Sequence, residues 1–418
     1  MPHSPLLLQL VLILGTARLL SLVMTRIGQP PVIGEMTAGI VLGPIVLGAL
    51  FPAWHAEVFA PASLPALEGL SQVGLVLFMF IVGAELRAPD GAKPQIVAAG
   101  YIAILSVLVP MAFGGVAAWL LYERYAPAGI DFPTFALFMA SAMSITAFPI
   151  MARILKERGM THSLIGRLSL TAAAIADVFA WIMLAMVVVM EDARQDWGHF
   201  ARMLLMLSAL AAVILVAGRP LLARLVARHT ADGRPAAPML ATLLIGTFAC
   251  AYATKWIGVH PVFGAFLFGA ALPRDDRLLH ALIERVEHVA IIVLMPVFFA
   301  LAGLSTTPAA FVGAGLSGLV VVLVAAVAGK VLGGAAGARL AGHPWRMSLA
   351  IGSLMNARAL MELIVMKVGL DAGVIGQDLF TMLMVMAILT TFMTGPLLTL
   401  FAGRDGAAAR ADGPVARR

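Results

Sequence analysis

Runs of about 20 apolar residues recur along nearly the whole chain, and they constrain the fold more than any other feature. An α-helix of that length is what crosses the hydrocarbon core of a bilayer. Of the 418 residues, 61% are apolar and 12% are charged, whereas a soluble domain has about 45–50% apolar and about 25% charged residues. So few charges cannot cover the surface of a soluble protein of this size. The sequence therefore predicts an all-α polytopic membrane protein with one membrane domain over residues 1–403.

We place thirteen candidate membrane-spanning helices on these runs. They lie near residues 5–25, 32–50, 66–86, 95–122, 132–156, 163–190, 200–218, 236–254, 259–273, 286–304, 308–338, 346–369 and 374–402. The first is interpreted as a spanning helix and not as a removed signal, because no small-residue cleavage site ends its apolar core. Residues 404–418, rich in Ala, Gly and Arg, are expected to form a short, disordered cytoplasmic tail.

The positive charges indicate how the helices are oriented. If the N-terminus is outside, Lys and Arg in the loops that face the cytoplasm outnumber those in the outside loops by about four to one. The outside loops hold Arg124, Arg194, Arg202, Lys255 and Lys367. Because positive charge accumulates in cytoplasmic loops, we expect a multi-pass protein of the cell inner (plasma) membrane. Its N-terminus would be outside and its C-terminus cytoplasmic.

Two of the predicted helices contain residues that should interrupt them. The segment 144–151 includes Pro149, which lacks a backbone donor and frees carbonyls in mid-membrane. The segment 352–362 carries an Asn, an Arg and a Glu, which are too costly to face lipid. The two helices are seven apart in the count and so run in opposite directions. Interrupted helices at matching positions of inverted repeats mark a transport site at the midplane; the alternative for Pro149 alone is an ordinary proline kink.

Asp177 lies at the centre of the predicted helix 163–190. A charge at that depth costs on the order of 2.5–3.5 kcal/mol on insertion scales, and the positions three and four residues away hold only Ala and Trp. A buried carboxyl near a cation can bind a proton and, once ionised, offers a small alkali cation the hard oxygen that it prefers. We interpret Asp177 as the group for which a proton and a monovalent metal cation compete. The alternative is a structural ion pair with another helix, chiefly through Lys330 or Arg358.

Several other residues are candidates for supporting roles. Lys330 could be a counter-charge to Asp177 or to the C-terminus of a broken helix, or it could snorkel to the cytoplasmic interface. Arg358 and Glu362 are four residues apart and could pair with each other, and such a pair would still line the site. Neutral oxygens for the ion or for loose backbone groups come from Ser144, Thr146 and Asn356. Secondary candidates are Glu35 and Glu85, which could be only interfacial, and His260, which could be a solvated helix cap.

The same sequence argues against several other classes of protein. Cys250 is the only cysteine and allows no disulfide within the chain. The 24 methionines fit adaptable helix packing and not a metal site. The net charge of +6 lies in short loops and forms no basic patch for nucleic acid. No His-Glu-x-x-His motif or supporting Ser/His spacing occurs, so we expect neither enzyme activity nor a cofactor.

Several longer motifs follow one another in a characteristic order. They are Gly28–Glu35, Ala38–Pro44, Gly74–Glu85, Ser144–Leu155, Gly258–Gly269, Met295–Gly303 and Met355–Leu370. On these stretches the chain resembles the monovalent cation:proton antiporter-2 family over nearly its whole length. The resemblance implies an NhaA-like antiporter fold with inverted repeats, in which two helices are unwound near 146–149 and 356–359 and cross. It also implies that Asp177 binds the ion.

The resemblance further implies how the chain is divided and assembled. A core transport part around residues 66–190 and 286–402 would move like an elevator against a dimerisation part made of the remaining helices. The expected assembly is a homodimer in the lipid bilayer. We expect no nucleotide-binding regulatory domain of the kind that some relatives of that family carry after the membrane part.

Three positions depart from the pattern of that family. Ala176 precedes Asp177 where Asn or Asp is usual, so one titratable group remains and we expect electroneutral exchange with one proton per cation. The tetrapeptide 356–359 is Asn-Ala-Arg-Ala instead of the common Asn-Thr-Arg-Gly and lacks a hydroxyl and a glycine. Lys255 stands where an acidic residue is common. These departures leave room for altered ion selectivity or slower transport.

The sequence as a whole predicts a secondary active transporter that exchanges Na⁺ or K⁺ for H⁺ across the membrane by alternating access. Such an activity fits a role in pH homeostasis. The alternative is a gated K⁺ channel or efflux pathway on the same fold without strict proton coupling.

Overall fold

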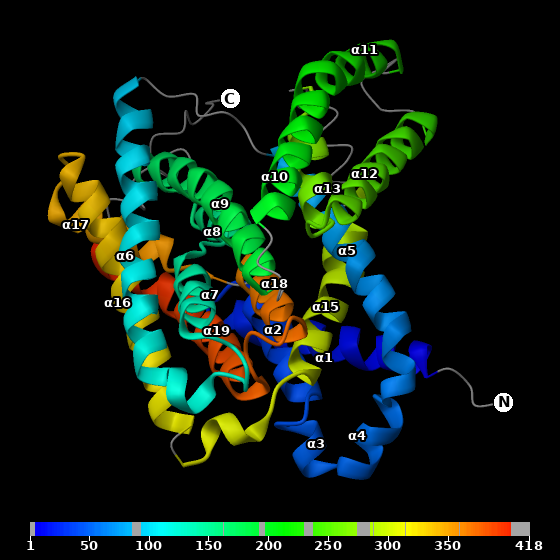
Figure 1. Cartoon of the computed structure of the whole chain (residues 1–418), viewed down its shortest axis with the longest axis vertical. Helices are drawn as coiled ribbons and strands as arrows, with labels where there is room; N and C mark the ends of the chain where they lie inside the picture. The colour runs from blue at the N-terminus through cyan, green and yellow to red at the C-terminus, as the bar shows by residue number, and fades with distance from the viewer. Residues whose placement is uncertain are drawn as a thin grey trace, which may run out of the picture. The chain divides into compact units, whose positions relative to one another are not determined.

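The structure is a computed structural model that describes residues 5–85, 93–161, 163–191, 197–229, 237–273, 285–286, 288–313, 315–358 and 360–402. Within these residues every regular element is a helix (Figure 1). The α-helices are α1 (Leu6–Arg26), α2 (Pro31–Leu42), α3 (Leu47–Leu50), α4 (Pro52–Val58), α5 (Leu64–Glu85), α6 (Lys93–Tyr125), α7 (Phe132–Ser144), α8 (Phe148–Glu157), α9 (Leu164–Glu191), α10 (Trp197–Ala212), α11 (Arg219–His229), α12 (Ala237–Ile257), α13 (Val262–Ala270), α15 (Met295–Leu304), α16 (Gly315–Leu340), α17 (Trp345–Met355), α18 (Leu360–Asp371) and α19 (Gln377–Ala402). Short 3₁₀ turns (Pro61–Ser63 and Pro308–Phe311) and π-helical turns (Val213–Gly218 and Ala290–Leu294) connect some of them. The expected all-α class is confirmed.

In the described part of the chain, 8 helical segments are long and apolar enough to cross a membrane on their own. They are Leu6–Arg26, Pro31–Leu50, Pro52–Glu85, Pro94–Tyr125, Ala201–Val226, Pro238–Ile257, Gly315–Leu340 and Gln377–Ala402. Each of the thirteen runs marked on the sequence contains helix in the structure. The runs 132–156 and 346–369 are each divided into two shorter helices, as their polar and proline residues predict, and the run 32–50 is divided into α2 and the short α3.

The chain folds into two compact units. The first consists of residues 1–17, 47–88 and 194–301, and the second of residues 18–46, 89–193 and 302–418. Asp177 and both divided helices belong to the second unit. The division into a transport part and a dimerisation part, which was expected with other boundaries, stays a prediction.

In the first unit, α13 packs closely against α5 through glycines on both helices. A Cβ added at Gly269 would lie 2.1 Å from the Phe80 carbonyl oxygen, and one added at Gly83 would lie 2.2 Å from the Phe266 carbonyl oxygen. Only glycine allows the two backbones to come so close. Small residues at such contacts are typical of helices that pack within a membrane.

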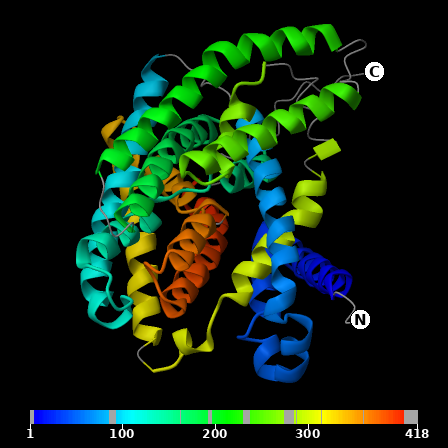
Figure 2. The same ribbon diagram turned by 45° about the vertical axis from the view of Figure 1, so that its right-hand side comes forward.

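In the second unit, α16 packs along α6 through Gly329, Gly333 and Gly337, which are spaced four residues apart on one face. A Cβ added at Gly333 would lie 2.5 Å from the Leu105 carbonyl oxygen, and one at Gly337 would lie 2.5 Å from the Ile102 Cα. In the same unit, α18 and α19 (orange to red in Figure 2) pack against each other. α16 also contacts α7 and α17, and α19 contacts α17.

Replacing Gly333 by alanine should loosen the contact between α16 and α6. The added methyl group would overlap the Leu105 carbonyl, and overpacking of this kind costs about 1–3 kcal/mol. We expect the melting temperature of the purified protein in detergent to fall by several degrees. Gly100→Ala in α6 is the matched control, because its methyl group would meet nothing within 4 Å and should not lower the melting temperature. A Gly333→Ala protein as stable as the wild type would contradict the packing.

Candidate functional site

The first interruption lies between α7 and α8. α7 ends at Ser144 and α8 begins at Phe148; between them Ile145 is extended (φ −70°, ψ 141°) and Ala147 is also outside the helical region (φ −92°, ψ 89°). Pro149 lies in the first turn of α8, where its missing N–H removes no helical hydrogen bond. The helix is therefore divided, but the division precedes Pro149, and the proline begins the second half-helix instead of kinking a continuous one.

The second interruption lies between α17, which ends at Met355, and α18, which begins at Leu360. The two interruptions meet, although they are far apart in the sequence. The backbone N–H of Ala147 donates to the carbonyl of Ala357 at 3.1 Å. This bond satisfies one donor and one acceptor that have left regular helix, which is the requirement for unwound backbone at membrane depth.

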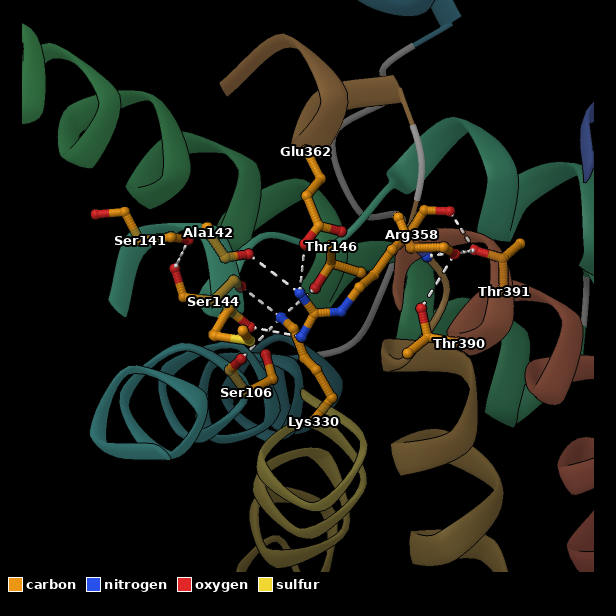
Figure 3. Close-up of polar contacts among 12 residues, drawn as sticks. Ser106, Ser141, Ala142, Ser144, Thr146, Lys330, Arg358, Glu362, Thr390 and Thr391 are labelled. Carbon is orange, nitrogen blue, oxygen red and sulfur yellow. Dashed lines mark hydrogen bonds and ion pairs between the residues drawn. The ribbon is translucent and has the colours of Figure 1, made fainter. Parts of the chain in front are cut away.

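Arg358 connects the second interruption to the end of α7 (Figure 3). Its Nη1 donates to the Ala142 carbonyl at 3.1 Å and to Glu362 Oε1 at 2.8 Å, and its Nη2 donates to the Met143 carbonyl at 2.7 Å. Arg358 and Glu362 are both fully buried. The guanidinium thus lies at the negative end of the α7 dipole and also neutralises the Glu362 carboxylate. The two residues form an ion pair, and the same arginine binds a neighbouring half-helix.

Lys330 of α16 lies at the same end of α7 (Figure 3). Its Nζ donates to the Ser106 carbonyl at 3.0 Å, to Thr146 Oγ1 at 2.6 Å and to the Ser144 carbonyl. These oxygens occupy the three donors of an ammonium group. Because the side chain is fully buried, it does not reach a membrane interface. The hydrogen bonds of Lys330 fit the arrangement at the C-terminus of a broken helix, and its role as a counter-charge to Asp177 stays a prediction.

Asp177 lies near the middle of α9 and is 4% exposed. Among the residues that the structure describes, none donates a hydrogen bond to its Oδ1. The Lys330 ammonium interacts with the carboxylate electrostatically. α9 packs against α7 and α8 and against α17 and α18, so the helix that carries Asp177 contacts half-helices from both interruptions. A buried acceptor without a donor is where a proton or a cation would be accommodated.

The three neutral candidates have different partners. Ser144 Oγ donates to the Ser141 carbonyl at 2.8 Å, and Thr146 Oγ1 accepts from Lys330. Asn356 Nδ2 donates to the Thr390 carbonyl at 3.3 Å. The Asn356 Oδ1 atom is buried and receives no donor from the described residues. Of the three side chains, Asn356 therefore keeps the acceptor that is most available to an ion.

The secondary candidates lie in other surroundings. Glu35 is a partly buried residue of α2 that interacts electrostatically with Arg153. Glu85 is the exposed last residue of α5. His260 lies between α12 and α13, near the charge of Lys255. His260 belongs with Glu85 to the first compact unit.

Several participants at the interruptions have no place among the candidates taken from the sequence. Most of them are backbone carbonyls, those of Ala142, Met143 and Thr390 among them. The backbone carbonyl of Ser106 is another, and a backbone contact has no sequence signature. The side chain that was missed is Thr391 of α19, whose Oγ1 accepts a hydrogen bond from the Arg358 N–H at 3.0 Å. The cluster of Thr390, Thr391 and Thr394 in an otherwise apolar run was the signal that could have indicated it.

Two divided helices that meet, with buried charges at their ends and a carboxylate on an adjacent helix, define a secondary transporter built from discontinuous helices. The chain belongs to the sodium/hydrogen exchanger family. The model of that family, described as "Sodium/hydrogen exchanger, transmembrane", matches residues 10–402 of the chain.

Individual relatives agree with this assignment. The chain is 37% identical over 391 residues to the Na⁺/H⁺ antiporter NhaS4 of Synechocystis. The alignment covers 93% of this chain and 95% of the relative. It is 34% identical over 408 residues to the K⁺/H⁺ antiporter 1 of Saccharomyces cerevisiae. That alignment covers 96% of this chain and 46% of the relative. The chain spans about half the length of that relative and of the cation/H⁺ antiporter 17 of Arabidopsis thaliana, to which it is 36% identical over 94% of its own length.

A solved structure shares the fold. The sodium proton antiporter MjNhaP1 from Methanocaldococcus jannaschii superposes with a TM-score of 0.61 at 14% identity, covering 97% of each chain. The antiporter fold expected from the sequence is thereby confirmed.

Proposed function

We propose that this protein exchanges a monovalent cation, Na⁺ or K⁺, for H⁺, and that the two compete for Asp177. The observation that carries the proposal is the buried carboxylate on α9, whose Oδ1 has no donor among the described residues. A protonated carboxyl is neutral, and an ionised one can be neutralised by a metal cation. The empty ionised form is the costly one to bury. If only the occupied forms move across the membrane, exchange is obligatory.

The proposal includes an assembly and an orientation. The transport part, around residues 66–190 and 286–402, moves against a dimerisation part within a homodimer. The protein lies in the cell inner membrane with its N-terminus outside and its C-terminus in the cytoplasm. The distribution of Lys and Arg between alternate loops supports the orientation. The names of the relatives support the exchange of Na⁺ or K⁺ for protons.

Reconstitution in vesicles tests the exchange directly. The vesicles contain a pH dye, and NaCl or KCl is added outside while the membrane potential is clamped. An exchanger alkalinises or acidifies the lumen in proportion to the cation gradient and continues under the clamp. A cation channel instead moves charge with the potential and needs no proton flux. Cation movement without a matching proton movement would refute the proposal in favour of the channel.

The charge balance of the exchange depends on the residue beside Asp177. Ala176 is buried and adds no titratable group, so we expect one proton per cation. Ala176→Asp should add a second carboxylate, and releasing two protons for one monovalent cation moves a net charge across the membrane. The exchange rate of this variant should then change severalfold when the clamped potential is varied, because moving one charge through 100 mV is worth about 2.3 kcal/mol.

Ala176→Asn is the matched control for that experiment. It places a side chain of nearly the same size at position 176 but adds no charge. We expect both the wild type and Ala176→Asn to exchange at rates that do not depend on the potential. Voltage-dependent exchange by the wild type would show that a second group moves with Asp177, and a loss of all exchange in Ala176→Asn would contradict the role given to this position.

A further inference from the structure

One side chain of α19 holds the backbone of the second interruption. Arg358 lies between α17 and α18, outside regular helix. Its N–H donates to Thr391 Oγ1 at 3.0 Å, and the Thr391 hydroxyl is also hydrogen-bonded to the Arg358 carbonyl. Figure 3 shows Thr391 beside this stretch of backbone. A single hydroxyl therefore serves both backbone groups of the residue whose guanidinium binds α7.

The Thr391 hydroxyl has one proton and two acceptors for it. One acceptor is the Arg358 carbonyl, and the other is the Ala387 carbonyl of the preceding turn, at 2.8 Å. Thr390 also donates to the Ala387 carbonyl, at 3.1 Å. The Ala387 carbonyl therefore still accepts a hydrogen bond from Thr390 when the Thr391 hydroxyl donates its hydrogen bond to the Arg358 carbonyl. Rotation of one hydroxyl makes or breaks a bond to the unwound segment without leaving the α19 carbonyl unpaired.

The contacts of Arg358 extend this bond toward the first interruption. The same residue donates to the Ala142 and Met143 carbonyls at the end of α7. A shift of the Arg358 backbone would therefore move the guanidinium relative to α7. All of these groups are fully or almost fully buried, so water does not readily replace a broken bond among them.

We propose that Thr391 is a positioning residue for ion exchange, which holds Arg358 and, through it, the C-terminus of α7. Its hydroxyl turns from the Arg358 carbonyl to the Ala387 carbonyl when the interruptions rearrange during transport. The inference rests on the proposed exchange function. Thr391 acts through Arg358 and does not bind the ion.

Thr391→Val tests this role, because valine keeps the shape of threonine and removes the hydroxyl. We expect the exchange rate per folded molecule to fall about tenfold, since two buried hydrogen bonds are lost. The cation concentration for half-maximal exchange should shift as well, because the geometry of the interruptions changes. Thr391→Ser restores the hydroxyl and should return both quantities to within about twofold of the wild type.

Thr394→Val is the matched control. Thr394 is buried on the same helix, and its hydroxyl donates to the Thr390 carbonyl at 2.9 Å. This variant loses a hydroxyl of α19 but no bond to Arg358, so we expect wild-type exchange. Equal losses in the two valine variants, normal exchange by Thr391→Val, or failure of Thr391→Ser to recover would each overturn the positioning role.

Hydrogen exchange of the Arg358 amide separates this inference from the function on which it rests. The amide donates to Thr391 Oγ1, so Thr391→Val should accelerate its exchange with solvent, whereas Thr394→Val should not. Unchanged protection in Thr391→Val would overturn the inference while the vesicle assay of the wild type still supports ion exchange. A wild type that exchanges no ions would overturn the proposed function, and with it the role of Thr391 in transport, even if the amide responds as expected.

Discussion

Asp177→Asn should abolish proton-coupled cation exchange. The amide is nearly isosteric with the carboxylate, but it neither releases a proton nor carries the negative charge that neutralises a metal cation. In vesicles with an internal pH dye, we expect cation-driven proton movement to fall to the rate of vesicles without protein. The melting temperature should stay the same or rise, because the variant no longer buries an acidic group.

Two matched variants separate the role of the carboxylate from a general effect of the substitution. Asp177→Glu keeps a carboxyl group one methylene longer and should retain part of the exchange. Asp371→Asn removes an acidic group from the end of α18, where its side chain is 59% exposed, and should exchange at the wild-type rate. If Asp177→Asn protein is folded and still couples cation movement to proton movement, the mechanism proposed for Asp177 is wrong.

Arg358→Met should destabilise the protein strongly. It leaves the Glu362 carboxylate buried without its cation and removes two hydrogen bonds to the end of α7. Breaking a buried ion pair on one side costs about 3–5 kcal/mol. We therefore expect a large fall in melting temperature, measured on purified protein in detergent, and a smaller fraction of folded protein in size-exclusion profiles. Exchange per cell should fall with the amount of folded protein.

α18 provides a control with the same sequence spacing. Lys367 and Asp371 are also four residues apart and form an ion pair of 2.6 Å, but their side chains are 34% and 59% exposed. Exposed pairs of this kind contribute about 0–1 kcal/mol, so Lys367→Met should barely change the melting temperature. Adding Glu362→Gln to Arg358→Met should recover part of the lost stability, because it removes the uncompensated charge. Equal stability of Arg358→Met and Lys367→Met would contradict the buried arrangement.

The sequence by itself determined the class of protein and the two divided helices, and it singled out Asp177, whose role stays a prediction. A bilayer permits few kinds of spanning structure, because backbone N–H and C=O groups must form their hydrogen bonds within the protein. A charged side chain in mid-membrane is also costly. Asp177 and the polar segment around Arg358 therefore stand out against apolar surroundings without any knowledge of the fold. The sequence also offered the pairing of Arg358 with Glu362 as one possibility, because the two lie four residues apart. The structure has this ion pair although Arg358 lies outside regular helix.

Only the tertiary structure decided which partners these groups have. Lys330 could have neutralised Asp177, reached the interface or bound a helix end, and its spacing in the sequence is compatible with each of these. In the structure, Lys330 donates hydrogen bonds to the Ser144 and Ser106 carbonyls. Arg358 donates to a carbonyl at the end of α7, and its N–H donates to Thr391. The physical reason is that backbone carbonyls are the same at every residue. Which of them accepts a bond depends on where a distant helix unwinds and how closely its neighbours pack.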